Sequence, residues 1–316
     1  MPASDRKIWM DGVLVPWPEA TVHILSHSLQ RGSLVFDYMS VHEVAGSPAI
    51  FRLDEHIERF LHSCELTGLE IGRDAAQIRA GIGETLRANP GATAIKVSGY
   101  LASIEIDVVP VDPSVTLSIA AYDPVQDIAA HKSAAGNAAP KRKTVRLWIE
   151  KDIKNRRADI VPPQAKTAAN YASPMVAKAR ARARGYDEIL LIDEFGNVAE
   201  GPTTNVFMVD GEGVLRTPPI ERVLLGVTRS SILEIAQHDG FEVREVAIRP
   251  DELLAAAEVF LTGTTAGVLP VESIDERPVG AGVPGPVSAR LSEHFSRVAA
   301  GEDATFAPWL TPVDAI

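Results

Sequence analysis

The first 122 residues carry mainly strand patterns, in short apolar runs broken by turn residues. An Asp-Gly turn at Asp11 and Gly12 joins two short runs, which predicts a hairpin at the start of the chain. Between these strands and later ones lie two segments with helical spacing. The predicted strands after the hairpin cover 33–43, 47–51, 93–103 and 114–123.

The two helical segments of this first part lie over 53–68 and 73–91. In the first, Ile57 and Phe60 belong to an apolar stripe that recurs every three to four residues, and Gly68 is a plausible stop. The second ends at an Asn-Pro-Gly sequence. Both helices are therefore expected to pack one apolar face against strands.

The second part begins with a strand over 145–150 and a predicted helix over 163–185, which Pro174 should break or kink. Strands over 187–193 and 197–210 are expected to be joined by a turn at 194–197. The remaining predicted elements are a strand over 214–218, a helix over 228–240, a short helix followed by a strand through 259–261, and a C-terminal helix over 285–300.

Strand runs that look antiparallel, with helices at their flanks, predict an α+β fold rather than a doubly wound parallel sheet. Residues 123–144 are rich in Ala, Pro, Gly and polar groups and have no period, as in a linker or loop. The chain has 316 residues, enough for two domains. We predict an N-terminal domain over 1–125, a linker over 126–144 and a C-terminal domain over 145–316.

Charge and composition exclude several classes of partner. The net charge is −11, which argues against nucleic acid, because a phosphate-binding protein needs a basic face. No apolar run approaches the ~20 residues of a membrane span, and the N-terminus lacks a signal-peptide core. Cys64 is the single cysteine and is expected to pack in a helix, so we expect a cytoplasmic protein without disulfides.

Several common catalytic motifs are absent from the sequence. Among eight histidines there is no HExxH or Cys/His cluster, so no metal site is expected. The spacing of His56 and His62 does not place them on one helix face. The sequence also lacks a GxSxG elbow, a phosphate-binding P-loop and a dinucleotide-binding GxGxxG pattern.

Three segments could bind a phosphate or carboxylate group. Gly226 stands directly before a predicted helix whose first turn contains Val227 and Thr228, where free N–H groups and the helix dipole favour an anion. The loop "LTGTTAG" offers small hydroxylated residues after a buried-looking strand. A helical arginine, Arg59, could bind phosphate with its planar fork. An ordinary helix start, a plain turn and a solvated arginine are the alternatives.

Lys166 and Glu200 stand in unusual surroundings for charged residues. Small residues surround Lys166 in "PPQAKTAANYASP", and a lysine kept away from water can become a nucleophile and form a Schiff base with an aldehyde cofactor. Glu200 follows an apolar run and is flanked by Ala199 and Gly201. An acidic partner of this kind keeps the pyridine nitrogen of pyridoxal phosphate protonated.

The order and spacing of four motifs resemble one family. "PQAKTAANY", "GYDEILLIDEFGNVAEGPTTNVF", "LLGVTRSSILEIA" and "VFLTGTTAGVLPV" follow one another as in the fold-type IV pyridoxal-phosphate enzymes, the class IV aminotransferases. "FRLDEHIERF" is similar to the helix of that family that carries a phosphate-binding arginine. The resemblance extends from about residue 8 to about residue 297. It implies a small N-terminal α+β domain, a larger C-terminal pseudo-barrel domain and a homodimer.

The resemblance also implies roles for individual residues. Lys166 would bind the cofactor covalently and move the proton of the reaction, and Glu200 would pair with the pyridine nitrogen. Thr264 and Thr265 would present N–H groups to the substrate carboxylate. The implied cofactor-binding set is Arg59, Lys166, Tyr171, Glu200, Gly226, Val227, Thr228 and Thr264.

The expected substrate pocket departs from the branched-chain members of the family. Those enzymes carry "FEGxR" where this chain has "FDYMSV", a stretch more similar to D-amino-acid and (R)-amine members. They also carry "YxRP", and here Lys96 and Ser98 take the places of its Tyr and Arg. We expect Phe36 and Tyr100 to line the pocket and Arg31 to supply a cation.

The predicted activity is a ping-pong transamination that depends on pyridoxal 5'-phosphate. A branched-chain or other apolar amino acid is the expected donor, and 2-oxoglutarate the expected acceptor. An (R)-amine or D-amino-acid transaminase is the main alternative. An aminodeoxychorismate lyase and a non-catalytic binding relative are further alternatives.

Overall fold

The computed structural model describes residues 3–129 and 143–316. Most of the linker predicted over 126–144 therefore lies outside the described residues, and the domain boundaries stay predictions. Within the described ranges, no helix is both long and apolar enough to cross a membrane. Contacts divide the chain into two units, which are described separately. The first comprises Met1–Pro140, Ala165–Ala169 and Ala299–Ile316, and the second comprises Lys141–Gln164 and Asn170–Val298.

A seven-stranded antiparallel sheet forms the first unit, in the order β15-β4-β3-β5-β6-β1-β2. The predicted hairpin around Asp11 and Gly12 is present as β1 and β2. The C-terminal strand β15 pairs with β4, a pairing that the sequence did not suggest. The strands are β1 (Lys7–Met10), β2 (Val13–Pro16), β3 (Leu34–Val44), β4 (Ser47–Phe51), β5 (Ala94–Leu101), β6 (Val115–Tyr122) and β15 (Leu310–Pro312).

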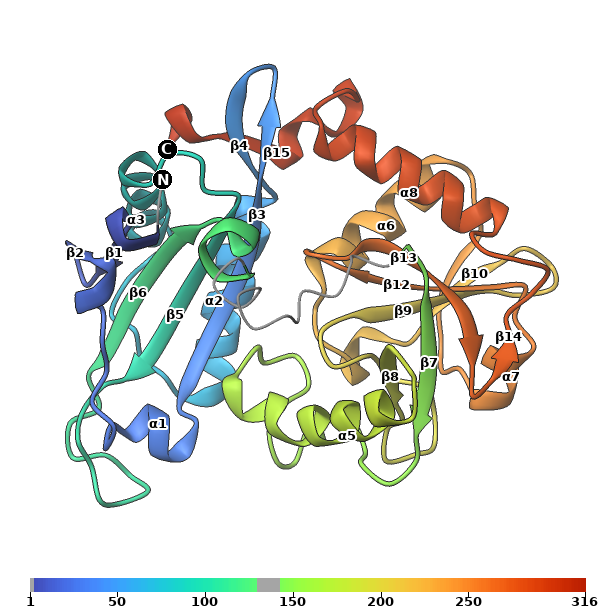
Figure 1. Cartoon of the computed structure of the whole chain (residues 1–316), viewed down its shortest axis with the longest axis horizontal. Coiled ribbons are helices and arrows are strands. Elements are labelled where there is room, and N and C mark those ends of the chain that lie inside the picture. The colour runs from blue at the N-terminus through green and yellow to red at the C-terminus, as the bar shows by residue number, and fades with distance from the viewer. Residues whose placement is uncertain (1–2, 130–142) are drawn as a thin grey trace. The chain divides into compact units, whose positions relative to one another are not determined.

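Helices α2 (Leu53–Thr67) and α3 (Ala75–Ala88) cover one face of this sheet (Figure 1). The α2 stripe that includes Ile57 and Phe60 is buried, and Gly68 ends the helix in a left-handed conformation, with φ of 69°. Both predicted helices are thus confirmed. The other helices of this unit are α1 (His27–Arg31), the π-helix η3 (Pro124–Ala129), and the 3-10 helices η1 (Ala3–Asp5), η2 (Trp17–Glu19), η6 (Ala304–Trp309) and η7 (Val313–Ala315).

The two faces of the sheet differ because side chains alternate along a strand. In β3, Val35, Asp37 and Met39 point toward the helices and are buried. Phe36 and Tyr38 point to the opposite face and are partly exposed. The register pairs Phe36 with Ser98 and Tyr38 with Lys96. This second face presents the aromatic, hydroxyl and lysine side chains of the candidate site.

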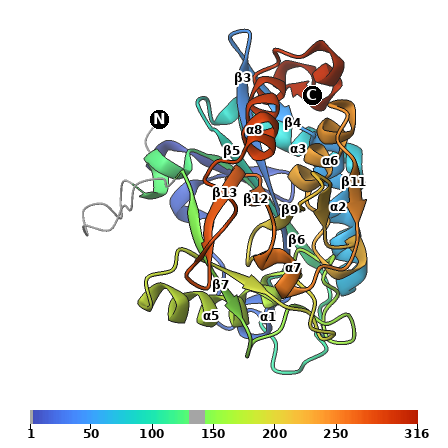
Figure 2. The same ribbon diagram turned by 90° about the vertical axis from the view of Figure 1, so that its right-hand side faces the viewer.

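The second unit contains an eight-stranded mixed sheet, in the order β11-β10-β9-β12-β13-β7-β8, with β14 paired to β13. Its β7–β8, β7–β13 and β10–β11 pairs are parallel, and the β12–β13 hairpin stands out in Figure 2. Its elements are β7 (Val145–Glu150), α5 (Ala172–Ala183), β8 (Glu188–Leu191), β9 (Asn205–Val209), β10 (Leu215–Thr217), η5 (Ile220–Arg222), α6 (Val227–His238), β11 (Val243–Glu245), α7 (Pro250–Leu254), β12 (Glu258–Gly263), β13 (Gly267–Ile274), β14 (Arg277–Pro278) and α8 (Pro286–Ala299).

The helix predicted over 163–185 is wrong in its first half. Only α5, from Ala172, is α-helical, and a 3-10 helix (η4, Ala168–Tyr171) precedes it. Thr167 instead forms an antiparallel bridge with Val35, so hydrogen bonds to β3 hold this segment out of a helix. Pro174 lies in the first turn of α5, where its missing N–H costs no helical hydrogen bond.

The strand predicted over 197–210 is also shorter than expected. β9 begins only at Asn205, because the Gly-Pro-Thr-Thr sequence before it forms a turn closed by Gly201 N–H and Thr204 C=O. The predicted turn at 194–197 is confirmed, because the Gly196 N–H donates to the Asp193 carbonyl and the Asp193 N–H to the Asn197 carbonyl. The residues after the turn bond back to the end of β8 through an antiparallel Ile192–Val198 bridge, whereas β9 itself lies between β10 and β12.

Candidate functional site

Lys166 is fixed by its backbone within the first unit. Its N–H donates to Oγ of Ser63 at 3.0 Å, and its carbonyl accepts from the N–H of Phe36 at 3.0 Å. The hydroxyl of Thr167 donates to the Leu34 carbonyl at 2.9 Å. These bonds attach the lysine segment to β3 and α2, so the backbone from which the Lys166 side chain extends is held in place.

The small residues around Lys166 have a packing reason. Ala165 is fully buried, and Ala169 lies against the backbone of Gly32, where an added Cβ would come within 3.5 Å of the Ala169 Cβ. A larger side chain in place of the fully buried Ala165 would have to displace its neighbours, whereas Ala169 is exposed and in ordinary van der Waals contact. The ammonium of Lys166 lies 5.1 Å from the centroid of the Phe36 ring, within the range of a cation–π contact.

A buried ionic cluster lies on the helix-facing side of β3. Arg59 donates to both carboxylate oxygens of Asp37, at 2.7 and 2.8 Å, and His56 Nδ1 lies 2.7 Å from Asp37 Oδ1. All three residues are buried. Ser63 connects this cluster to the lysine segment, since its hydroxyl donates to the Arg59 carbonyl at 2.7 Å and accepts from Lys166.

The cluster fixes the charge states of its members. Burial opposes ionisation of Asp37, but the charge of Arg59 and the hydrogen bonds from His56 and Arg59 help to outweigh it and hold the pKa of Asp37 well below its usual range. Burial lowers the pKa of His56 from 6.5. The positive charges of Arg59 and Lys166 lower it further, while Asp37 raises it without reversing the shift. His56 is therefore neutral at pH 7 and Asp37 is ionised, so the cluster pairs one guanidinium with one carboxylate.

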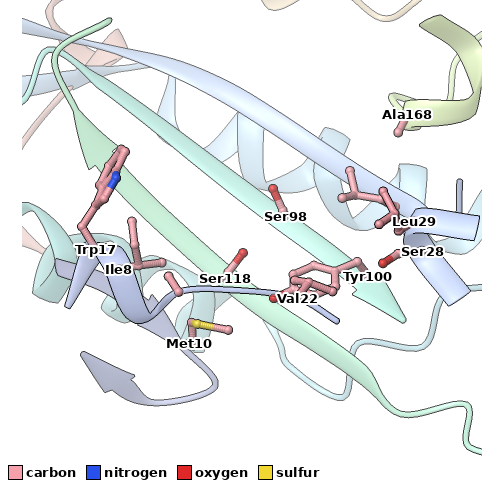
Figure 3. A pocket seen from close by; sticks show the side chains of 12 residues that line it. Ile8, Met10, Trp17, Val22, Ser28, Leu29, Ser98, Tyr100, Ser118 and Ala168 are labelled. Atoms are coloured by element: carbon pink, nitrogen blue, oxygen red, sulfur yellow. The ribbon is translucent and has the colours of Figure 1, made fainter. Parts of the chain in front are cut away.

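A cavity of about 700 Å³ lies on the face of the first sheet opposite α2 and α3 (Figure 3). Its walls are largely apolar, with hydroxyls from Ser98, Ser118 and Tyr100. Burial raises the pKa of Tyr100, so its phenol stays protonated. Arg31, expected as a substrate cation, is exposed at the end of α1, and its Nη2 donates to the Ile106 carbonyl. The register places Phe36 on the same face as Tyr100, and Tyr100 lines the cavity.

Glu200 lies in the second unit and is only 2% exposed. Its Oε2 accepts from the Leu224 N–H at 3.1 Å and from the Asn205 amide at 3.4 Å. Its Oε1 lies 3.3 Å from Nη1 of Arg156. Every one of these partners is a donor, which is the environment of an ionised carboxylate.

Tyr171 and Glu200 both contact the side chain of Arg156. The guanidinium carbon of Arg156 lies 5.1 Å from the centre of the Tyr171 ring. Nη1 of Arg156 reaches Glu200, while its buried Nε has no hydrogen-bond partner. Tyr171 and Glu200 are thus brought together through Arg156, a residue that no sequence motif indicated.

Gly226 begins α6 next to Glu200. A Cβ at this position would lie 1.9 Å from Oδ1 of Asn205, so only glycine fits. No side chain caps the helix, which leaves the N–H groups of its first turn, at Val227 and Thr228, for an anion. The predicted helix start is confirmed, and Asn205 joins it to Glu200.

Thr264 and Thr265 form the turn of the β12–β13 hairpin, which is also part of the second unit. Thr264 is partly exposed and Thr265 is exposed. Gly263 brings the hairpin against the Gly-Pro-Thr-Thr turn, since a Cβ there would lie 3.2 Å from the Thr203 carbonyl. The buried hydroxyl of Thr204 in that turn has no hydrogen-bond partner. Glu200, the α6 start and this hairpin therefore form one polar region.

Sequence reasoning missed four residues that shape these sites. Asp37 and His56 were missed because their contacts join a strand to a helix, which no local pattern reveals. Arg156 stands in a run of basic residues without a motif. Asn205 is the last residue of the EGxxxN motif, so a signal for it was present.

Comparisons with known proteins show the family of the chain. The profile of the family described as amino-transferase class IV matches residues 34–274. Branched-chain-amino-acid aminotransferases of Salmonella typhimurium and Pseudomonas aeruginosa are 32% and 31% identical, covering 97% and 99% of both chains.

A solved branched-chain aminotransferase from Thermoproteus uzoniensis is 32% identical. It covers 98% of this chain and 99% of its own, with a TM-score of 0.88. The predicted α+β fold of type IV is confirmed. The chain belongs to the class IV aminotransferases and is a pyridoxal-phosphate-dependent transaminase.

Proposed function

We propose that this transaminase acts on branched-chain or other apolar amino acids, with 2-oxoglutarate as the amino acceptor. The observation that carries the proposal is the similarity, over nearly the whole chain, to enzymes named branched-chain aminotransferases. The apolar cavity beside Tyr100 suits an aliphatic side chain. The reaction is ping-pong, so donor and acceptor use one site in turn.

The residues present fit pyridoxal phosphate. When bound, the cofactor supplies an electron sink for charge that develops at the substrate Cα. Glu200 would hold the pyridine nitrogen, because a buried carboxylate stabilises a cation that it contacts. The unpartnered buried Nε of Arg156 and the hydroxyl of Thr204 are polar atoms near Glu200 that a bound group can satisfy.

We assign the phosphate of the cofactor to the N–H groups of Val227 and Thr228, and extend the assignment to Gly226, Thr264 and, as the cation, Arg59. The uncapped start of α6 supports the first part of this assignment. Arg59 shares its guanidinium with Asp37, which orients it. Thr264 and Thr265 are assigned to the substrate carboxylate, since they form an accessible turn.

Lys166 is the proposed base. It would hold the cofactor through its Nζ. Once the substrate has displaced it, the amine would take the proton from the substrate Cα and return it two atoms away, at the carbon on the other side of the substrate nitrogen. The ring of Phe36 supports this role, because it limits where the lysine Nζ can move. Tyr171 is proposed to lie against the cofactor, positioned by Arg156.

We also propose a cytoplasmic homodimer. Two loops of the first unit expose large aliphatic side chains and are bonded to one another, through His27 N–H to the Ser103 carbonyl at 2.9 Å. Such a patch is unusual on a monomer and suits a second copy of the chain. Its members are Ile24, Leu25, Leu29, Ile104, Ile106, Val108, Val109 and Val111. Light scattering should give a dimer mass, and Ile106→Asp should shift it toward the monomer.

A donor panel tests the substrate assignment. The holoenzyme is incubated with leucine, isoleucine, valine and 1-phenylethylamine as separate enantiomers, against 2-oxoglutarate and pyruvate, and product chirality is read. L-Leucine with 2-oxoglutarate should give L-glutamate at the highest kcat/KM. Turnover confined to D-amino acids or the (R)-amine would replace this assignment with the alternative activity.

The role of Lys166 has its own test. The holoenzyme should show an absorbance band near the visible edge, and Lys166→Ala should abolish it together with turnover. Lys178→Ala, which changes a lysine on α5 paired with Glu188, is the control and should retain both. A band that survives Lys166→Ala would show that another group holds the cofactor.

A further inference from the structure

Two histidines and an aspartate come together from the end of α6 and from α8, two helices of the second unit that are labelled in Figure 1. His238 is the last residue of α6, Asp239 follows it as the cap, and His294 lies in α8. One nitrogen or oxygen atom of each residue lies within 4.8 Å of those of the other two. Asp239 and His294 are 55 residues apart in the chain, so no local motif marks this cluster.

The distances within the cluster suit one small divalent ion. Oδ1 of Asp239 lies 3.1 Å from Nδ1 of His294 and 3.6 Å from Nδ1 of His238. The ligands of a tetrahedral zinc ion, each about 2.0–2.1 Å from the metal, lie roughly 3.3 Å from one another. The 3.6 Å separation exceeds the length of a hydrogen bond, but it is close to this spacing between ligands.

The two imidazole rings are also close enough to share an ion. Their centroids are 5.8 Å apart and their planes are inclined by 64°. Two imidazoles on one tetrahedral ion have centroids roughly 5 Å apart. His294 is buried, whereas His238 is exposed, so rotation of the His238 side chain can close the remaining gap without disturbing packed neighbours.

Arg290 orients the carboxylate of Asp239 toward the two histidines. Its Nε donates to Oδ2 of Asp239 at 3.2 Å, and its Nη2 donates to the Asp239 carbonyl at 3.2 Å, which leaves Oδ1 facing the imidazoles. Carboxylates that bind metals are commonly held by such hydrogen bonds. Arg290 is 57% exposed, so water screens its charge. The negative end of the α6 dipole also favours a cation here.

We propose that His238, Asp239 and His294 bind a zinc ion, which joins the end of α6 to α8. Two imidazoles and one carboxylate are ligands that zinc prefers, and the exposed side of His238 leaves the fourth position to water. Mg²⁺ and Ca²⁺ prefer oxygen ligands and fit poorly. The start of α6, to which the cofactor phosphate is assigned, lies about 16 Å away along this 12-residue helix, so the site is separate from the cofactor.

The test titrates Zn²⁺ into the holoenzyme, prepared without a histidine tag and dialysed against a chelator. Calorimetry measures binding at pH 7.5, because a metal binds the neutral imidazole, and a thermal scan measures stability. His238→Asn, Asp239→Asn and His294→Asn each remove one ligand. His62→Asn is the matched control, since His62 also lies 3.6 Å from a carboxylate oxygen, that of Glu65, but belongs to a different helix.

The unmodified holoenzyme should bind one Zn²⁺ per chain and melt at a higher temperature with zinc than without it, because an ion bound by the folded state stabilises that state. Mg²⁺ should not change the melting temperature. Each of the three variants should bind Zn²⁺ at least about 10-fold more weakly and lose the zinc-dependent rise. His62→Asn should keep both properties of the unmodified holoenzyme.

His238→Asn decides the outcome, because it changes an exposed side chain and should melt at the unmodified temperature when zinc is absent. Failure of the unmodified holoenzyme to bind Zn²⁺, or binding that His238→Asn leaves unchanged, would overturn the proposal. The cluster would then be a hydrogen-bonded group, in which Asp239 pairs with His294 and Arg290 alone. A loss of affinity in His62→Asn equal to that in His238→Asn would likewise show adventitious surface binding.

Discussion

Arg59 donates two hydrogen bonds to the carboxylate of Asp37, at 2.7 and 2.8 Å, where Asp37 has no exposed surface. Asp37→Asn removes the negative charge and leaves a buried guanidinium uncompensated. Breaking such a pair costs about 3–5 kcal/mol, which should lower the melting temperature by about 10 °C in a thermal scan.

Asp54→Asn is the matched control for Asp37→Asn, because Asp54 also pairs with an arginine of the first unit, Arg79, but is 67% exposed. An exposed pair of this kind contributes about 1 kcal/mol or less. Equal changes in melting temperature for the two variants would mean that burial does not strengthen the Asp37 pair.

The buried imidazole of His56 should make stability depend on pH. Burial lowers its pKa below 6.5, so the unfolded chain takes up the proton more readily than the folded one. The contribution of His56 is complete above about pH 6.5 and is lost as the pH falls toward the lower folded pKa. Urea unfolding at pH 7.5 and pH 5.5 should therefore show a smaller loss of stability for His56→Asn than for the unmodified protein.

His62→Asn, which changes a half-exposed histidine of the same helix, is the control for the pH experiment. It should lose the same stability on acidification as the unmodified protein. A pH response of His56→Asn identical to that of the unmodified protein would contradict the assignment of acid sensitivity to this side chain.

The absence of a side chain at Gly226 should be essential for the site around Glu200. In Gly226→Ala the new methyl group meets Oδ1 of Asn205, which must move and weaken its bond to Glu200. Cofactor affinity, measured by equilibrium dialysis, should fall at least 10-fold. Gly211→Ala, at a loop position where a Cβ meets nothing within 4 Å, should bind the cofactor normally.

Glu200→Gln tests the partner of the cofactor ring. The amide keeps the size of the side chain but cannot hold a pyridinium, so the variant should bind cofactor and lose turnover by roughly 100-fold or more. Glu212→Gln, in an exposed loop, is the control. Full turnover in Glu200→Gln would assign the pyridine nitrogen to another residue.

Elements with a local period were predictable from the sequence. The helix expected over 53–68 is α2, because its apolar stripe and Gly68 are properties of neighbouring residues. The segment around Lys166 was not predictable. Its conformation depends on Ser63, 103 residues away, and on the edge of β3, so long-range hydrogen bonds override its helical composition.

The residues of the candidate site also fall into those that a local motif predicts and those that it does not. The motif around Glu200 identified that residue because the turn, the glutamate and Asn205 are close in sequence. Arg156 gave no such signal, since its position is defined by a loop packed against Tyr171. Local motifs therefore reveal a cofactor family, while a residue whose contacts depend on tertiary packing requires the structure.

Residues Ala165–Ala169 belong to the first unit, although the residues on either side of them belong to the second. The chain leaves the second unit at Gln164 and returns to it at Asn170, so Lys166 is contributed to the first unit by a five-residue excursion. A fragment cut at the linker would separate the lysine from Ser63 and Phe36, which hold its backbone. In a chimera of this enzyme with a relative, residues 165–169 must therefore come from the same parent as the N-terminal unit, even though the sequence around them comes from the other parent.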